Sequence, residues 1–236
     1  MHDFEFTPET GGLILVDKPL GWTSFDAVSK IRGAMRSVVK RKNFKVGHAG
    51  TLDPLASGLL IMAYGPRTKE LPQLTGLEKA YLGTVTLGAT TPSYDLETAP
   101  EPVGPWEQLS EEEIRAAFER FHGEVEQRPP LYSAKRHQGE RGYFLAREGV
   151  QVEMPAVKVL ITRLEVTAIR GADVDFEVHV SKGTYIRSLA HDVGQVLGCG
   201  AYLSALRRTA IGPYRVEAAH PPAAWAQRIA PLPDRG

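Results

Sequence analysis

Residues 47–63 read GHAGTLDPLASGLLIMA, a polar, glycine-rich segment joined directly to an apolar one. Three glycines and a proline within residues 47–58 predict a shaped loop, because both residue types interrupt regular structure. The apolar run at residues 59–63 predicts a short strand. Pro54 disfavours helical torsions at the residue before it, so the carboxylate of Asp53 is expected to stand on a stiff, extended turn.

Helices and strands are predicted in irregular alternation on both sides of this segment. Residues 13–16 predict a buried strand, and Thr23 or Ser24 can cap a following helix. A capping box at Ser110 and Glu113 predicts a helix over residues 110–121, closed by Gly123. The apolar face of the first helix would consist of Phe25, Val28, Ile31 and Met35. The other predicted elements are strands at 81–87, 157–169 and 174–180, a helix at 140–147, and a helix opened by 181–187 that ends at Gly198. Long amphipathic strands favour an antiparallel or mixed sheet, so the fold class is α+β.

Composition indicates a folded protein of ordinary type. Of the 236 residues, 42% are apolar and 24% are charged, and the longest apolar run, residues 59–64, is too short to span a bilayer. The first residues lack a basic leader followed by an apolar stretch, so we expect a cytoplasmic protein. The single cysteine, Cys199, excludes an intramolecular disulfide and a cysteine-rich zinc site, and is expected to be a small buried filler.

The charges are balanced in number but not in position. The chain has 28 basic and 28 acidic residues, yet residues 27–52 hold no acid. Such segregation can create a nucleic-acid-facing side on a neutral protein, although from charge alone a solvated surface is an equal alternative. The basic residues of this stretch are Lys30, Arg32, Arg36, Lys40, Arg41, Lys42 and Lys45, and a second set is Arg128, Lys135, Arg136, Arg141 and Arg147.

Asp53 and Arg187 are the residues whose positions suggest chemistry. Arg187 falls in the first turn of a predicted helix, where a cation opposes the helix dipole and needs a nearby anion. Asp53 or a phosphate could be that anion, and an arginine beside a carboxylate keeps it ionised at neutral pH. The alternatives are a structural ion pair for Arg187 and, for Asp53, a loop aspartate that only satisfies backbone groups.

Five segments in order resemble the bacterial tRNA pseudouridine-55 synthases (TruB-type pseudouridine synthases). The two opening motifs are residues 17–24, DKPLGWTS, and residues 46–58, VGHAGTLDPLASG. Residues 79–81 (KAY), 127–139 (QRPPLYSAKRHQG) and 181–187 (SKGTYIR) match in the same order. The resemblance runs from about Gly12 to Tyr214 and implies a pseudouridine synthase fold: a mixed, largely antiparallel sheet with flanking helices and an active-site cleft on one face.

The resemblance implies an enzyme that isomerises one T-loop uridine of tRNA to pseudouridine by base flipping, without a metal or cofactor. Asp53 would be the essential carboxylate, acting either by addition to the uracil ring or by assisting cleavage of the glycosidic bond. Tyr81 would stack on the target base and remove the C5 proton, Arg187 would hold Asp53, and Tyr185 would line the pocket. His48 would wedge into the T-loop. The other expected RNA-binding residues are Lys18, Gly50, Leu206, Arg136, Lys40, Arg41 and Lys42.

Plainer roles remain open for two of these residues. A tyrosine on an amphipathic strand, such as Tyr81, is usually part of the core. A loop histidine such as His48 often bonds a backbone carbonyl. No His, Asp and Glu set has metal-ligand spacing, and no glycine-rich phosphate loop follows a strand, in agreement with a redox-neutral, cofactor-free isomerisation.

The sequence departs from the family pattern at three places. Thr91-Pro92-Ser93 precede Asp95 where a Thr-Asp-Thr run is usual, which can alter a mobile RNA-contacting loop. Lys135 and Arg136 replace a hydrophobic residue and a lysine, which keeps the charge. Only 21 residues follow Arg215 in the chain of 236, too few for the PUA domain of many relatives. The expected division is an N-terminal extension at 1–11, a catalytic domain at 12–215 and a C-terminal strap at 216–236.

Two other functions stay open at this stage. A guide-dependent pseudouridine synthase of ribosomal RNA shares the aspartate motif but is expected to depend on partner proteins and to keep the PUA domain. A non-catalytic tRNA-binding or RNA-folding protein would not need Asp53. The favoured expectation is a monomer that acts on the T-arm of tRNA without a membrane or an obligatory protein partner.

Overall fold

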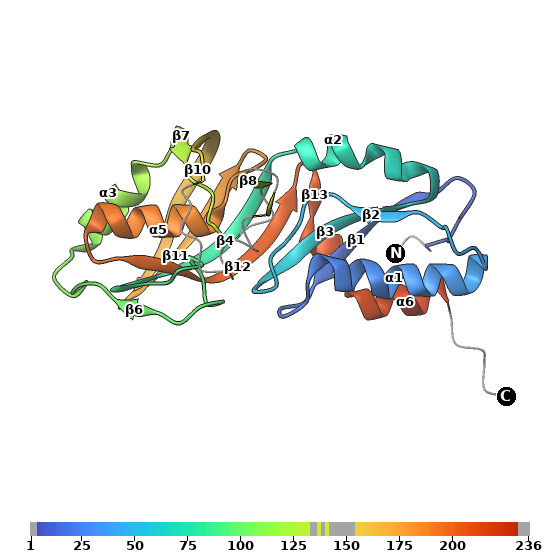
Figure 1. Ribbon diagram of the computed structural model, residues 1–236, viewed down its shortest axis with the longest axis horizontal. Helices are drawn as coiled ribbons and strands as arrows, with labels where there is room; N and C mark the ends of the chain where they lie inside the picture. Colours follow the sequence, from blue (N-terminus) through green and yellow to red (C-terminus); the bar gives the residue numbers. More distant parts are fainter. Residues whose placement is uncertain (1–3, 133–135, 138–139, 142–153, 231–236) are drawn as a thin grey trace. The chain divides into compact units, whose positions relative to one another are not determined.

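The computed structural model describes residues 4–132, 136–137, 140–141 and 154–230, and these form two compact units (Figure 1). Unit 1 contains residues up to Lys79 together with those from Arg207 onward, and unit 2 contains Ala80–Leu206. The strand registers are antiparallel and helices flank the strands, so the predicted α+β class is confirmed.

The strands of unit 1 are arranged around β3 (Ala56–Tyr64). β1 (Gly12–Lys18) pairs with it from Gly12↔Tyr64 to Lys18↔Gly58, and the short β2 (Val46–His48) also pairs with it. β3 is followed in the strand order by β12 (Ala201–Ile211), which continues into β13 (Tyr214–Arg215). The predicted strands at 13–16 and 59–63 are therefore confirmed, and both are longer than predicted.

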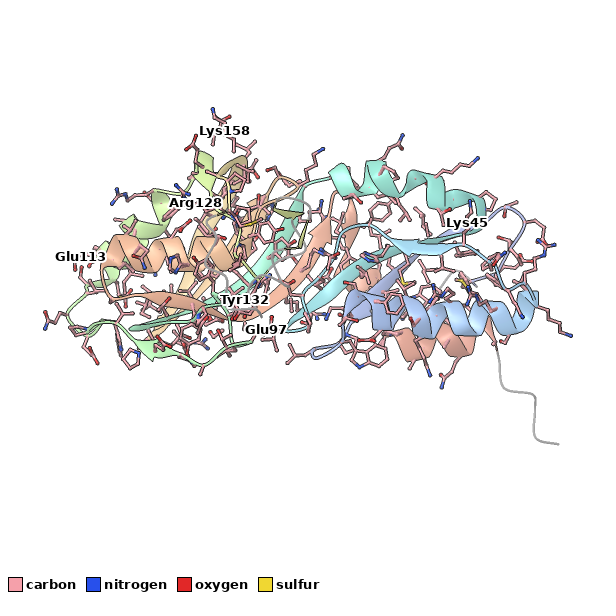
Figure 2. All side chains as sticks on the ribbon, viewed as in Figure 1. Lys45, Glu97, Glu113, Arg128, Tyr132 and Lys158 are labelled. Atoms are coloured by element: carbon pink, nitrogen blue, oxygen red, sulfur yellow. The ribbon has the colours of Figure 1, made fainter. Side chains whose placement is uncertain are left out.

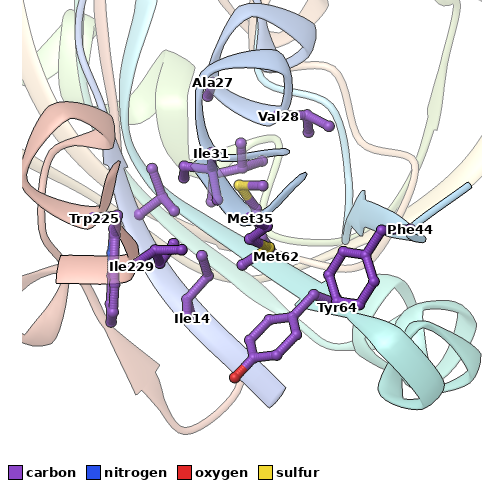
Figure 3. Close-up of a cluster of buried hydrophobic side chains, with 12 residues drawn as sticks. Ile14, Ala27, Val28, Ile31, Met35, Phe44, Met62, Tyr64, Trp225 and Ile229 are labelled. Carbon is purple, nitrogen blue, oxygen red and sulfur yellow. The ribbon is translucent and has the colours of Figure 1, made fainter. Parts of the chain in front are cut away.

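Two hydrophobic clusters explain why β3 is apolar at almost every position. Successive side chains of a strand point to opposite faces, so Leu60 and Met62 enter one cluster while Leu59 and Ile61 enter another. Figure 3 shows the first cluster, in which α1 (Ser24–Val39) and α6 (Pro222–Ile229) contribute side chains. A strand that is buried on both faces has apolar residues at successive positions, and lacks the alternation of apolar and polar residues found in a half-exposed strand.

Helix α1 begins at the capping box of Thr23 and Asp26. Its buried face matches the prediction at Val28, Ile31 and Met35, but Phe25 is 63% exposed, so that part of the prediction is wrong. The guanidinium carbon of Arg32 lies 5.6 Å from the centre of the Phe25 ring, a cation–π contact that accounts for an exposed aromatic here.

The tail after β13 adds to the core of unit 1. It contains η2 (Val216–Ala218) and then α6. Trp225 of α6 is buried and donates from Nε1 to the carbonyl of Leu15 over 2.7 Å. His220 exchanges backbone hydrogen bonds with Leu15 and Asp17 of β1. The segment is therefore packed against β1.

Unit 2 is a sheet with the strand order β12, β4, β11, β10, β7. β4 spans Lys79–Leu87, β7 Gly123–Gln127, β10 Val157–Arg170 and β11 Asp173–Val180. α3 (Glu111–Glu119) packs on β10 and on α5 (Ile186–Leu197). Gly83 of β4 is required because a Cβ there would lie 2.5 Å from the ring of Phe176. The predicted strands and two of the three helices predicted in this unit are confirmed, although α3 ends at Glu119 and Gly123 opens β7.

The helix predicted at residues 140–147 is wrong at the two residues that the structure describes. Glu140–Arg141 form β9, paired with β8 (Arg136–His137), and residues 142–147 lie outside the described part of the chain. The remaining elements are η1 (Gly65–Glu70), α2 (Leu71–Gly76), β5 (Ala89–Thr90) and β6 (Glu101–Pro102). Within the described residues, no helix is both long enough and apolar enough to cross a membrane.

Candidate active site

The loop that carries Asp53 in unit 1 connects β2 to β3 and is fixed to the start of α1. Ser24 is buried, its hydroxyl accepts from Leu52 N over 2.8 Å, and it donates to Leu52 O over 3.0 Å. Gly21 N donates to Pro54 O over 2.8 Å. Asp53 itself is half-buried, between two residues whose backbones are held. The first motif of the sequence therefore supports the second through direct hydrogen bonds.

Arg208 of β12 holds the same loop from the strand side. The residue is only 1% exposed, and its guanidinium donates from Nε to Leu59 O over 2.7 Å. Nη2 donates to Gly50 O over 3.2 Å and Nη1 to Thr51 O over 3.4 Å. One arginine thus bonds the backbone on both sides of Asp53, and this residue was not predicted from the sequence. The neighbouring sequence carries no signal for this role, because the bonding partners of Arg208 are distant in the chain.

Arg207, the preceding residue, contacts β1 and the start of β3 through its own side chain. It forms a two-pronged ion pair with Asp17, at 2.8 and 3.1 Å, and Nη1 lies 3.3 Å from the hydroxyl of Ser57. β3 also approaches β12 closely at Gly58, where a Cβ would lie 2.3 Å from Arg208 O. With φ of +105° at Gly58, no larger residue fits this junction.

Lys18, at the end of β1, is fully buried. Its ammonium donates to the carbonyl oxygens of Pro19 and Trp22. Burial lowers its pKa to about 8, Asp53 opposes that shift and Arg208 adds to it. Lys18 therefore contributes positive charge near Asp53 at neutral pH.

His48 and Gly50 shape the loop before Asp53. His48 ends β2 and is half-buried, and burial is the main cause that lowers its pKa, so the ring is neutral at pH 7. Gly50 has φ of +87°, a conformation that favours glycine. A neutral, flat ring at this position fits the predicted stacking role, which stays a prediction.

In unit 2, Arg187 lies in the first turn of α5 and is 4% exposed. Its Nη1 lies 3.6 Å from Oδ2 of Asp95, which is also buried, and donates to Ser93 O over 3.3 Å. A buried anion for this cation was expected from the helix dipole, but Asp95 was not the expected partner. Asp53 lies in unit 1, so its predicted pairing with Arg187 stays a prediction.

The start of α5 is held by the end of β7. Gln127 is 2% exposed, and its side chain both accepts from Tyr185 N, over 2.7 Å, and donates to Tyr185 O, over 2.9 Å. The hydroxyl of Ser188 donates to the carbonyl of Arg128 over 2.7 Å (Arg128 is labelled in Figure 2). Tyr185 is the N-cap residue and is half-buried. Two of the five sequence motifs are therefore bonded to each other here.

The other predicted residues are found on several elements. Tyr81 lies in β4 and is 8% exposed, and Leu206 lies in β12 and is half-buried. Lys40, Arg41 and Lys42 are exposed directly after α1. Arg136 lies in β8, and its side chain, like all of Lys135, is outside the described residues. In the part of the chain that can be described, no group of three or more His, Cys, Asp or Glu residues could hold a metal ion.

Comparison with known proteins places this arrangement in a family. Residues 36–186 match the family model for the N-terminal domain of TruB family pseudouridylate synthases, and residues 187–221 match that for the tRNA pseudouridylate synthase B C-terminal domain. Among curated proteins, tRNA pseudouridine synthase B of Chlorobium luteolum is 50% identical over 89% of this chain and 72% of its own length. That of Flavobacterium johnsoniae is 47% identical over 89% of this chain and 94% of its own length.

A solved structure supports the fold. The crystal structure of a Cbf5-Nop10-Gar1 complex matches with a TM-score of 0.66 and 34% identity, over 86% of this chain and 50% of that chain. The chain therefore spans about half the length of the solved protein that it matches.

Proposed function

The chain belongs to the TruB family of pseudouridylate synthases, and we propose that it isomerises the T-loop uridine of tRNA, at position 55, to pseudouridine. In this reaction the bond from C1′ to N1 of the base breaks, and a bond from C1′ to C5 forms. The proton on C5 is lost and N1 gains a proton, so the isomerisation is balanced without an oxidant or reductant. The matched family model covers residues 36–186 and is the observation that carries the proposal.

Asp53 is the proposed catalytic carboxylate. It can add to the uracil ring or assist departure of the base from C1′, and both routes need an ionised, precisely placed oxygen. Ser24 and Arg208 hold the backbone before Asp53, and Arg208 also bonds Leu59 O after it, which supports a fixed position. Small errors in the position of a catalytic group cost large factors in rate, so a loop bonded at both ends suits this role.

Tyr81, Arg187 and Tyr185 have proposed roles around the flipped base. Tyr81 would stack on the uracil and take the C5 proton, since a stacked ring replaces the contacts that a base loses on leaving its helix. Arg187 would bond Asp53 in addition to Asp95, and Tyr185 would line the pocket. The burial of Arg187 supports this assignment, because a buried guanidinium needs anionic partners.

The tRNA would be held by exposed basic residues of unit 1 and by the loop before Asp53. Lys30, Arg36 and Lys45 are exposed on α1 and the segment after it, with Lys45 labelled in Figure 2. Together with Lys40, Arg41 and Lys42 they form an acid-free basic stretch, whose cations can neutralise phosphates. Lys18, Gly50, His48, Leu206 and Arg136 are the further proposed RNA-binding residues. A monomer without an obligatory protein partner is part of the proposal.

The guide-dependent alternative is weaker for this chain. The solved structures of a Cbf5-Nop10-Gar1 complex and of an H/ACA RNP bound to a substrate RNA match at 34% and 31% identity. Curated tRNA pseudouridine synthases B match at 42–50% identity over about nine tenths of the chain. The higher similarity favours tRNA as the substrate.

The deciding experiment is tritium release from a tRNA transcript labelled at C5 of uridine. The wild-type protein and Asp53→Ala are compared, and the product is mapped by reverse transcription after carbodiimide treatment. We expect one equivalent released at one T-loop uridine, and none with the variant. Binding of tRNA without release in either protein would favour the non-catalytic alternative.

A further inference from the structure

Tyr94 has a backbone conformation that residues with a side chain rarely adopt. Its φ is +63°, and Lys40, a helix cap, is the other described residue besides glycines with positive φ. A Cβ in this left-handed region is strained, so the surrounding structure must impose it. Tyr94 lies directly before Asp95, in the segment where the sequence departs from the family pattern.

The segment of residues 91–98 is closed by its own hydrogen bonds. The hydroxyls of Thr91 and Ser93 both donate to Asp95 O, over 2.7 and 3.1 Å. Thr98 N donates to the hydroxyl of Ser93 over 3.2 Å, and Glu97 N donates to Oδ1 of Asp95 over 3.0 Å. Thr91 and Ser93 are buried. The segment is therefore an ordered turn that presents Tyr94 and Asp95 on successive positions.

These two side chains contact α5 one helical turn apart. Asp95 lies 3.6 Å from Arg187, and the ring of Tyr94 stacks on His191 with centroids 3.9 Å apart and planes inclined by 16°. Arg187 and His191 are four residues apart on a helix and therefore share a face. The turn thus docks on α5 through one ion pair, one aromatic stack and the hydrogen bond from Arg187 to Ser93 O.

The surroundings of His191 favour a stacking role. Burial lowers the pKa of His191, so the ring is neutral at pH 7 and adds no second cation beside Arg187 to compete for Asp95. Its Nδ1 is buried without a hydrogen-bond partner among the described residues. The stack on Tyr94 is thus a contact of a neutral, half-buried ring.

We propose that Tyr94 and His191 are positioning residues, whose stack holds the turn so that Asp95 keeps the guanidinium of Arg187 in its working orientation. This inference rests on the proposed function, in which Arg187 supports the catalytic Asp53. The positive φ of Tyr94 is consistent with it, because the same turn places the Tyr94 ring on His191 and the Asp95 carboxylate beside Arg187. Ordinary core packing is the competing explanation.

The first test compares Tyr94→Gly with Tyr94→Phe. Glycine removes the ring but relieves the positive φ, so backbone strain cannot explain a loss, whereas phenylalanine keeps the stack. We expect Tyr94→Gly to lower the single-turnover rate on a T-arm RNA about tenfold or more, with the Kd for that RNA within about twofold of wild type. Tyr94→Phe should restore the rate to within about twofold. His191→Ala and His191→Phe form the matched pair on the helix.

The second test asks whether the stack acts through Asp95. In an Asp95→Asn background, Tyr94→Gly should slow the reaction by less than about twofold, because the interaction that it supports is already gone. If the two substitutions act through independent packing effects, the factors by which they slow the reaction should multiply in the double variant. Multiplicative rates, or a Tyr94→Gly variant as fast as wild type, would overturn the inference. If Tyr94→Gly fails to show cooperative thermal unfolding, the same cycle is run with His191→Ala.

The wild-type protein and Asp53→Ala are measured alongside. An inactive wild type would contradict the proposed function, whereas an active wild type with unaffected Tyr94 and His191 variants would contradict only the positioning role.

Discussion

Arg208 donates a hydrogen bond of 2.7 Å to the carbonyl oxygen of Leu59, which ties β12 to β3 directly beyond the loop of Asp53. The same guanidinium bonds Gly50 O and Thr51 O on the other side of that loop. All three acceptors are backbone carbonyl oxygens. Water cannot easily take the place of the guanidinium as their donor, because Arg208 is 1% exposed. The position of Asp53 therefore depends on a residue 155 positions later in the chain.

Replacement of Arg208 by methionine should destabilise the protein and slow catalysis together. The buried carbonyls lose charged donors, so we expect the free energy of unfolding to fall by about 2–5 kcal/mol. Arg207→Met is the matched control, and its partly exposed ion pair with Asp17 should be worth about 1 kcal/mol or less. Urea unfolding measures both values. Equal losses in the two variants would contradict the special role of Arg208.

Replacement of Asp53 by asparagine should abolish turnover and leave binding intact. The amide keeps the size of the side chain but cannot act as a nucleophile or an anion, so we expect the single-turnover rate to fall about 10³-fold or more. The Kd for tRNA should stay within about threefold, because binding depends on phosphate contacts. Glu70→Gln, a surface carboxylate paired with Arg67, is the control and should keep its activity. A slow but substantial turnover by Asp53→Asn would assign the essential step to another group.

Local patterns predicted much of the fold. The capping box of Ser110 and Glu113 and the stop of α5 at Gly198 involve residues close in sequence, so their signals are complete within a few positions. The predicted helix at 140–147 is wrong at its start, because pairing with Arg136–His137 decides the structure there. The apolar spacing of the first helix also predicted a buried Phe25. The ring is exposed instead and contacts the guanidinium of Arg32.

The sequence motifs predicted the candidate site residues, but they did not predict the residues that hold them in place. The sequence indicated that Arg187 needs an anion, and Asp95, 92 positions earlier, supplies one. Strand β12 was not predicted, because two consecutive arginines do not resemble a buried strand. Arg208 can be buried only because the folded chain brings three distant carbonyl groups to it. Such partners are set by tertiary pairing and leave no local pattern.

Neutralising Lys40, Arg41 and Lys42 together, as glutamines, should weaken tRNA binding and flatten its salt dependence. Each phosphate contact contributes about 0.7–0.9 to the slope of log K against log salt, so loss of up to three contacts should reduce the slope by about 2–3. The control neutralises Lys158, Arg163 and Arg170, exposed cations of β10 that each pair with a carboxylate. Filter binding at several salt concentrations gives the slopes. An unchanged slope in the first variant would show that this basic segment does not contact tRNA.

Lys18 should make the stability of the protein rise with pH in the alkaline range. Its pKa is about 8 in the folded protein, lowered chiefly by burial, against an ordinary value of 10.5 in the unfolded chain. Between these values the unfolded chain binds more protons, so raising the pH favours the folded state. Below pH 8 both states are protonated and the full cost of burying the charge is present. By pH 10.5 that cost is lost, a difference of about 3 kcal/mol at about 1.4 kcal/mol per unit.

The measurement compares wild type with Lys18→Met by urea unfolding from pH 7 to 10.5. The variant lacks the titrating group while other ionisations are shared, so their contributions cancel in the difference. We expect the wild type to gain stability relative to the variant across this interval, and the difference to be constant between pH 6 and 7. A difference that is flat up to pH 10.5 would mean that the ammonium is not buried in a way that costs free energy. Lys18 would then have an ordinary pKa in the folded protein, and burial would not affect its charge near Asp53.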